Sequence, residues 1–106
     1  MESVVNIAQD EANDLFRITI GNEMTIYSVD EIKEEISKGV NECKRIEINL
    51  STVEDCDSAG VQLLLMIKKE LSEKSKELKI VSMSGVVKKR LESYDVLKAF
   101  DCGEVA

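Results

Sequence analysis

One stretch of the chain, residues 50–67, limits the possible folds more than any other segment. It reads LSTVEDCDSAGVQLLLMI. We predict a strand that ends near Leu50, then a polar, acidic loop. Asp57 and Ser58 follow, and either can start a helix, because Asp and Ser oxygens accept hydrogen bonds from its first free N–H groups. A strand, a short loop and an apolar helix in this order indicate an α/β fold.

The residues at this predicted helix start have separate roles. If Asp57 is the cap, Ser58 takes the first helical position and its hydroxyl is free to point outward. Gly60 then lies in the first turn, where glycine costs about 1 kcal/mol relative to Ala. We therefore expect something to approach the Gly60 backbone closely, either a neighbouring strand or a partner. The following residues are apolar nearly all round, which indicates deep burial or a second face offered to a partner.

Other segments of the chain have the alternation and composition of strands. Residues 4–8 and 15–20 are predicted strands, and the loop between them suits an antiparallel hairpin. Gly21-Asn22 is expected to end the second strand. Residues 45–50 alternate charged and aliphatic side chains, which predicts a central strand next to the hairpin, and 78–81 predicts a further strand.

Two more helices are expected. Ser28 and Glu31 have the spacing of a capping box, and Gly39 can end the helix that they begin. Ser84 can cap the other helix. The predicted buried positions are Val29, Ile32, Ile36 and Val40 on the first helix, and Met83, Val87, Leu91 and Tyr94 on the second. Residues 96–100 form either a last strand or a short final helix.

These elements predict a single small α/β domain over residues 1–106. We expect a mixed sheet of four to five strands, mostly parallel beyond the first hairpin, with helices packed mainly on one face.

Composition excludes several classes of function. The net charge of −7 argues against a nucleic-acid surface, which needs a basic patch. Lys88-Lys89-Arg90 is the only basic triplet, and we interpret it as a solvated helix face or a small contact patch for an acidic partner. No apolar run is long enough to cross a membrane, and the chain begins with no secretory signal pattern.

The cysteines and the absence of histidine point to a protein without metal or redox chemistry. Cys43, Cys56 and Cys102 are widely separated, and an odd count without metal-binding spacing fits reduced thiols in a cytoplasmic protein. Cys56 lies between Asp55 and Asp57, which should disfavour its thiolate.

Residues 57–65 read DSAGVQLLL. This run resembles the Asp-Ser-[Ser/Thr/Ala]-Gly-x-x-x-Leu signature of the STAS domain family, which includes the anti-sigma factor antagonists. In that family a partner kinase phosphorylates the Ser after the Asp, so the resemblance implies that Ser58 is a phosphoacceptor. It also implies partner-binding roles for the residues around it, namely Asp57, Ser58, Ala59, Gly60 and Gln62.

The segment before the first predicted helix also resembles this family. STAS domains often carry Gly-Glu-Leu-Asp there, and residues 22–25 read NEMT. In antagonists this loop helps form the partner-binding face, so the resemblance adds Glu23 and Thr25 to the candidate binding residues. Because Asn22 replaces the Gly and Thr25 replaces the Asp, the identity of the partner stays open.

The residues around Ser58 offer little chemistry of their own. A nucleophilic serine needs a base within hydrogen-bond reach, the chain has no histidine, and Lys68 and Lys69 lie too far along the helix. The acids at 54, 55 and 57 lack the spacing of a calcium loop. Gly60 stands alone, without a phosphate-binding glycine pattern. We expect no catalytic residue, metal or cofactor.

Two interpretations of the function follow. The first is a regulatory protein, not an enzyme, that binds an anti-sigma factor with serine kinase activity through the Ser58 loop and is switched by phosphorylation of Ser58. The second is a STAS-type binding subunit of a transport ATPase complex, or of a chemotaxis or stressosome-like assembly, without that switch. Ser58 is then an ordinary N-cap of the helix. Neither predicts binding to nucleic acid or insertion into a membrane, and the oligomeric state stays open.

Overall fold

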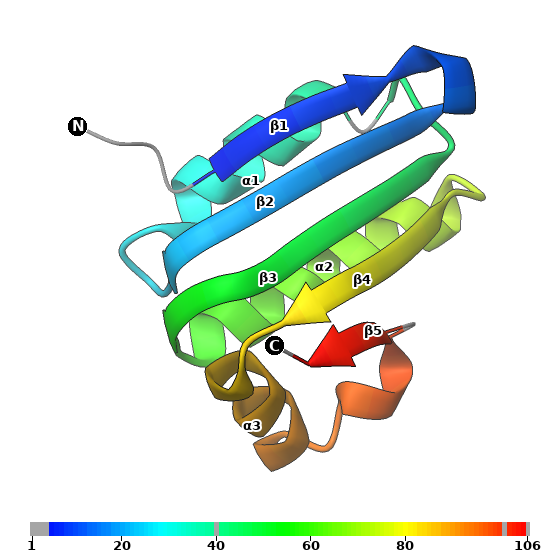
Figure 1. The fold of residues 1–106 in the computed structure, drawn as a ribbon. Coiled ribbons are helices and arrows are strands. Elements are labelled where there is room, and N and C mark those ends of the chain that lie inside the picture. Colours follow the sequence, from blue (N-terminus) through cyan, green and yellow to red (C-terminus); the bar gives the residue numbers. More distant parts are fainter. Residues whose placement is uncertain (1–4, 40, 101, 106) are drawn as a thin grey trace.

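A single five-stranded sheet with three helices forms the protein (Figure 1). The computed structural model describes residues 5–39, 41–100 and 102–105. The strands are β1 (Val5–Asp10), β2 (Leu15–Met24), β3 (Arg45–Cys56), β4 (Glu77–Met83) and β5 (Cys102–Val105). The helices are α1 (Val29–Gly39), α2 (Ser58–Glu73) and α3 (Gly85–Ser93), with short 3-10 turns at Glu11–Asn13 and Leu97–Ala99.

The strands lie in sequence order across the sheet, β1-β2-β3-β4-β5. β1 and β2 form an antiparallel hairpin, and every later pair is parallel. The predicted hairpin, the central position of β3 and the mostly parallel sheet are therefore confirmed. The segment over 96–100, predicted as either a strand or a helix, contains a 3-10 turn, and the last strand follows it.

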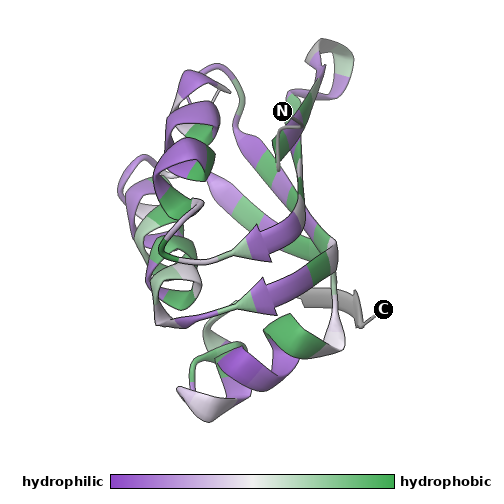
Figure 2. Ribbon diagram, turned by 90° about the vertical axis from the view of Figure 1, so that its left-hand side faces the viewer, coloured by the Kyte–Doolittle hydropathy of each residue, from purple (hydrophilic) through white to green (hydrophobic). Residues whose placement is uncertain are grey.

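The two long helices cover one face of the sheet. Figure 1 shows α1 and α2 behind the strands, and the rotated view in Figure 2 shows both on the same side, with α3 near one end. The opposite face carries polar side chains, because the residues that alternate with the buried ones point away from the helices. Arg17 and Glu47 form an ion pair at 3.3 Å on adjacent strands.

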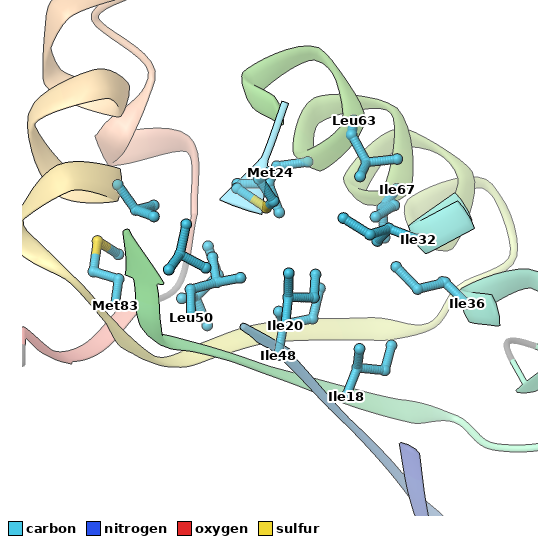
Figure 3. Close-up of a cluster of buried hydrophobic side chains, with 14 of the residues drawn as sticks. Ile18, Ile20, Met24, Ile32, Ile36, Ile48, Leu50, Leu63, Ile67 and Met83 are labelled. Carbon is cyan, nitrogen blue, oxygen red and sulfur yellow. The ribbon is translucent and has the colours of Figure 1, made fainter. Parts of the chain in front are cut away.

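The core lies between this sheet and the helices (Figure 3). Apolar residues that alternate along β2 and β3 face apolar residues spaced three or four apart on α1 and α2. The labelled contributors are Ile18, Ile20, Met24, Ile48, Leu50 and Met83 from the strands and Ile32, Ile36, Leu63 and Ile67 from the helices.

Most of the predicted helix faces are confirmed, but Met83, predicted on the same helix as Val87, is the buried last residue of β4. Val87 and Leu91 of α3 are buried as expected. Tyr94 is 48% exposed, contrary to the prediction, because α3 ends at Ser93 and the helical spacing no longer applies. The predicted contributions of Val40 and of position 4 lie outside the described residues.

Two predicted strand ends were wrong. β3 runs six residues past Leu50 to Cys56, and β2 runs through Gly21-Asn22 to Met24. The extensions pair with each other, with Met24 opposite Cys56, and the register shifts twice along this stretch. Both residues of this last pair are fully buried, so the extended strands belong to the core.

Candidate functional site

The start of α2 lies at the edge of the sheet where the parallel strands end. In Figure 1 the β2–α1 loop and the starts of α2 and α3 gather at this edge, beside the C-terminal ends of β2, β3 and β4. Loops at the carboxyl ends of parallel strands are the usual place for binding sites in α/β sheets. The candidate residues at 23, 25 and 57–62 all belong to this edge.

Asp57, one of the two candidate caps, is the residue that caps α2. One carboxylate oxygen accepts hydrogen bonds from the backbone N–H groups of Ala59 at 2.9 Å and Gly60 at 3.3 Å. Because Asp57 is the cap, Ser58 is the first helical residue. The Ser58 side chain is exposed, and its hydroxyl has no hydrogen-bond partner within the described part of the chain. It is open to a partner protein.

Gly60 is buried against the protein's own strands. A Cβ built on Gly60 would collide with the carbonyl oxygen of Met24 and lie 3.0 Å from the Sγ of Cys56. The close approach expected at this glycine is therefore made by the ends of β2 and β3. Glycine lets α2 begin directly over the last paired residues of these strands.

The β2–α1 loop is held by buried hydroxyls. Thr25 and Ser28 are 5% and 4% exposed. The Ser28 hydroxyl accepts a hydrogen bond from the Thr25 N–H at 3.0 Å and lies 3.0 Å from the Glu23 carbonyl oxygen, to which it can donate. The Ser28 carbonyl accepts from the Ile32 N–H at 3.1 Å, so α1 begins directly after this residue. The loop has a defined conformation, in which Thr25 offers almost no surface.

Asp57 connects this loop to α2. Its second carboxylate oxygen accepts a hydrogen bond from the Ile26 N–H at 3.0 Å, and its own N–H donates to the Met24 carbonyl at 3.3 Å. The β2–α1 loop and the Ser58 helix start are therefore one connected unit.

The surface on the β3 side of Ser58 is acidic. Glu54 and Asp55 are exposed, and Glu23 is the register partner of Asp55 on β2. These three carboxylates lie near Asp57, and the exposed guanidinium of Arg90, at the Cys56 carbonyl, is a cation close to them.

Cys56 is unreactive in this setting. Burial is the main cause that raises the pKa of its thiol, to about 11, and Asp57 and Asp55 raise it further, while Arg90 lowers it. The predicted direction is confirmed, although burial outweighs the acids. Arg90 belongs to the basic triplet and is exposed, and its Nε donates to the Cys56 carbonyl at 2.8 Å, which ties α3 to the end of β3.

A groove of about 210 Å³ lies between α1 and α2 next to Ser58. Its lining combines apolar side chains from the β2–α1 loop and both helices with Gln62 and two charged residues of α1. The lining residues are Ile26, Val29, Asp30, Lys33, Ala59, Gln62, Leu63 and Met66.

The sequence matches the STAS domain family over residues 6–105. The chain belongs to the STAS domain family. Its relatives include the anti-sigma-B factor antagonist of Staphylococcus aureus, 28% identical over 89 residues that make up 83% of this chain and 82% of the relative. The Staphylococcus epidermidis protein of the same name is 27% identical over 84 residues, or 76% of this chain and 75% of the relative.

Solved structures share this fold. The anti-sigma factor antagonist SpoIIAA in its unphosphorylated form has a TM-score of 0.77 at 19% identity, over 93% of this chain and 87% of that one. An anti-sigma factor antagonist from Mycobacterium paratuberculosis has a TM-score of 0.82 at 16% identity, over 93% and 83%. The small α/β fold predicted from the sequence is the STAS fold.

The STAS fold brings all the candidate residues together, but they differ in what they can contact. Ser58 and Gln62 are exposed, and Ala59, Asp57 and Glu23 are partly buried. Gly60 and Thr25 are buried, so their contribution is to position the surface.

Sequence reasoning missed Ile26 and Tyr27, which are 64% and 91% exposed in the β2–α1 loop of this STAS domain. The available signal was a pair of large apolar residues just before a helix cap.

The described residues offer no candidate metal site and no membrane-spanning helix. They hold no cluster of three or more His, Cys, Asp or Glu side chains placed to bind a metal. No helix among them is long and apolar enough to cross a membrane.

Proposed function

We propose that this STAS domain is an anti-sigma factor antagonist that binds an anti-sigma factor with serine kinase activity, and that phosphorylation of Ser58 switches the binding off. The observation that carries the proposal is the exposed Ser58 hydroxyl at the first position of α2, directly after the Asp57 cap. The antagonist names of relatives, and a solved structure of SpoIIAA in a phosphorylated form, support it.

The chemistry belongs to the partner. The kinase transfers the γ-phosphoryl group of ATP to the Ser58 Oγ: a new O–P bond forms, the bond from the γ-phosphorus to the bridging oxygen breaks, and ADP leaves. The hydroxyl proton passes to a base of the kinase. This chain contributes an accessible hydroxyl at a fixed position, because the Asp57 carboxylate accepts from the Ala59 and Gly60 N–H groups and the Asp57 N–H donates to the Met24 carbonyl.

The added phosphate acts mainly on the interface. It brings about −1.5 to −2 charges, and the α2 N-terminus favours it by about 0.3–1 kcal/mol. Two unit charges roughly 5 Å apart repel by about 0.8 kcal/mol in water and about 3 kcal/mol near a protein surface, so Asp55 and Asp57 oppose it. An exposed phosphate keeps its hydration in the free protein. A partner pressed against Ser58 must desolvate it beside existing acids, so binding weakens.

The test uses the anti-sigma factor kinases encoded in the genome that carries this chain. Each kinase is purified, and its affinity for the unmodified protein is measured by calorimetry. The STAS protein is then incubated with the kinase and ATP, and its intact mass is measured by mass spectrometry. We expect one kinase to bind and to add a single phosphate, on Ser58. Ser58→Ala should bind that kinase and stay unmodified.

Ser58→Asp should bind about 100-fold more weakly. The matched control is Ser72→Asp, which adds the same charge at an exposed position near the other end of α2 and should bind like the unmodified protein. Equal affinity of Ser58→Asp and the unmodified protein would count against the switch. Binding to none of the kinases would count against the antagonist assignment.

A further inference from the structure

Half of the large exposed apolar residues in the described part of the chain lie in the β2–α1 loop and the groove next to the start of α2. Six large hydrophobic side chains are exposed in the described residues, and three of them belong to this region: Tyr27 at 91%, Ile26 at 64% and Met66 at 37%. Ile26 and Met66 line the groove between α1 and α2, and Tyr27 is next to Ile26 in the loop. Apolar groups gathered on one surface mark an interaction site.

The loop holds Ile26 and Tyr27 outward through backbone contacts. The Ile26 N–H donates to the Asp57 carboxylate at 3.0 Å, and the Tyr27 N–H donates to the Thr25 hydroxyl at 3.3 Å. Neither side chain is needed for these bonds. A partner therefore meets two side chains whose backbone is already ordered, which lowers the entropy cost of binding.

The charges around this apolar patch identify the kind of partner. Asp30 lines the groove, and Glu54 and Asp55 are exposed beyond Asp57. Lys33 is the only basic residue of the groove lining, and Arg90, at the Cys56 carbonyl, lies outside that lining. The whole chain carries a net charge of −7. A second copy would place acidic rims against each other, whereas a partner with Lys or Arg around an apolar recess would be complementary.

We propose that Ile26 and Tyr27 are the apolar anchor of the partner interface, and that the partner receives them in an apolar recess edged by Lys and Arg. This inference rests on the proposed function and assigns separate roles to the two parts of the site. Ile26 and Tyr27 supply affinity by burying apolar surface, and Ser58 supplies the response to phosphorylation. Tyrosine is common among residues that dominate binding at the centre of interfaces.

The anchor is tested with the kinase that binds the unmodified protein. Tyr27→Ser and Ile26→Ser keep every backbone hydrogen bond of the loop and remove exposed side chains, so both variants should fold. We expect each to weaken binding by about 30-fold. The control is Tyr94→Ser, which removes an exposed tyrosine at the end of α3, outside the patch, and should bind like the unmodified protein.

Salt separates the apolar anchor from the charged rim. Between about 0.05 M and 0.5 M NaCl, the loss of affinity in Tyr27→Ser should stay constant, since burial of apolar surface is weakly screened. Asp55→Asn should bind more weakly at low salt and converge with the unmodified protein at high salt.

Three results would overturn the proposal. In the first, the kinase binds the unmodified protein, Tyr27→Ser and Ile26→Ser with equal affinity. The proposed function then stands, but Ile26 and Tyr27 are not the anchor. In the second, sedimentation shows that the unmodified protein is a dimer and that Tyr27→Ser is a monomer. A second copy of the chain would then be what binds the apolar patch. In the third, no kinase binds the unmodified protein, so the proposed function and the anchor fail together.

Discussion

The carboxylate of Asp57 accepts a hydrogen bond from the backbone N–H of Ile26, 31 residues earlier in the chain. Its other oxygen accepts from Ala59 and Gly60 at the start of α2. One side chain therefore caps the helix that carries Ser58 and fixes the loop that presents Ile26. Asp57 is a positioning residue: both its oxygens are occupied within the chain.

Asp57→Ala should lower the free energy of unfolding by about 1–3 kcal/mol, because it removes the helix cap and leaves the Ile26 N–H without its acceptor. Urea unfolding measures this change. Asp57→Asn is the matched variant. Its side-chain oxygen can still cap α2, whereas its NH₂ group cannot accept from Ile26. Hydrogen exchange at the Ile26 amide should accelerate in both variants, while the Ala59 amide stays protected only in Asp57→Asn. Unchanged exchange at Ile26 would contradict the role of Asp57 as a bridge.

Gly60→Ala should destabilise the protein by about 1–3 kcal/mol, although alanine is the better helix former, because the new methyl group collides with the Met24 carbonyl and crowds Cys56. Gly85→Ala is the control. It places the same methyl group at the start of α3, where nothing lies within 4 Å, and should leave stability unchanged or slightly raised. Thermal unfolding of both variants checks the pair. Equal effects at the two positions would mean that the approach of Met24 to α2 is not a tight contact.

Local chemistry was enough to limit the α2 cap to Asp57 or Ser58 and to predict the close approach to Gly60, since both follow from neighbouring residues. The end of β3 could not be predicted that way. Its buried residues after Leu50 are Val53 and Cys56, three apart, because register shifts interrupt the alternation. This spacing lacks the alternation of buried and exposed residues by which strands are recognised in a sequence.

The fit between β2 and β3 depends on residues about 30 positions apart. Gly21 pairs with Thr52, and Asn22 with Val53. Asn22 has a φ of 61°, a left-handed conformation that asparagine tolerates better than most residues. The Gly21-Asn22 pair that was expected to end β2 therefore lies inside the strand, next to a register shift. The extension of β2 and β3 therefore depends on pairing between residues that are distant in the sequence, and no local sequence pattern predicts it.

The buried thiol of Cys56 should make stability fall at high pH. Burial raises its pKa from 9.0 to about 11, so between these values the unfolded chain loses a proton that the folded protein keeps. The free energy of unfolding should therefore be unaffected by this group below about pH 9 and decrease by about 1–3 kcal/mol as the pH rises to about 11.

Urea unfolding at a series of pH values measures this dependence. Cys56→Ala is less stable at neutral pH because it leaves a small cavity, but its stability should decline less steeply over the same pH range. Parallel curves for the two proteins would show that the Cys56 thiol does not titrate differently in the folded and unfolded states.

A negative charge at Ser58 should leave the fold nearly unchanged. Ser58→Asp places the charge at the α2 N-terminus, which favours it, and beside Asp55 and Asp57, which oppose it, so the melting temperature should shift by no more than about 4 °C. Any destabilisation should shrink in high salt, because repulsion between exposed carboxylates is screened. Ser58→Asp combined with Asp55→Asn should be at least as stable as Ser58→Asp alone. A loss of about 10 °C or more would place the effect of the charge in the fold, and weaker partner binding by Ser58→Asp could then no longer be assigned to the interface.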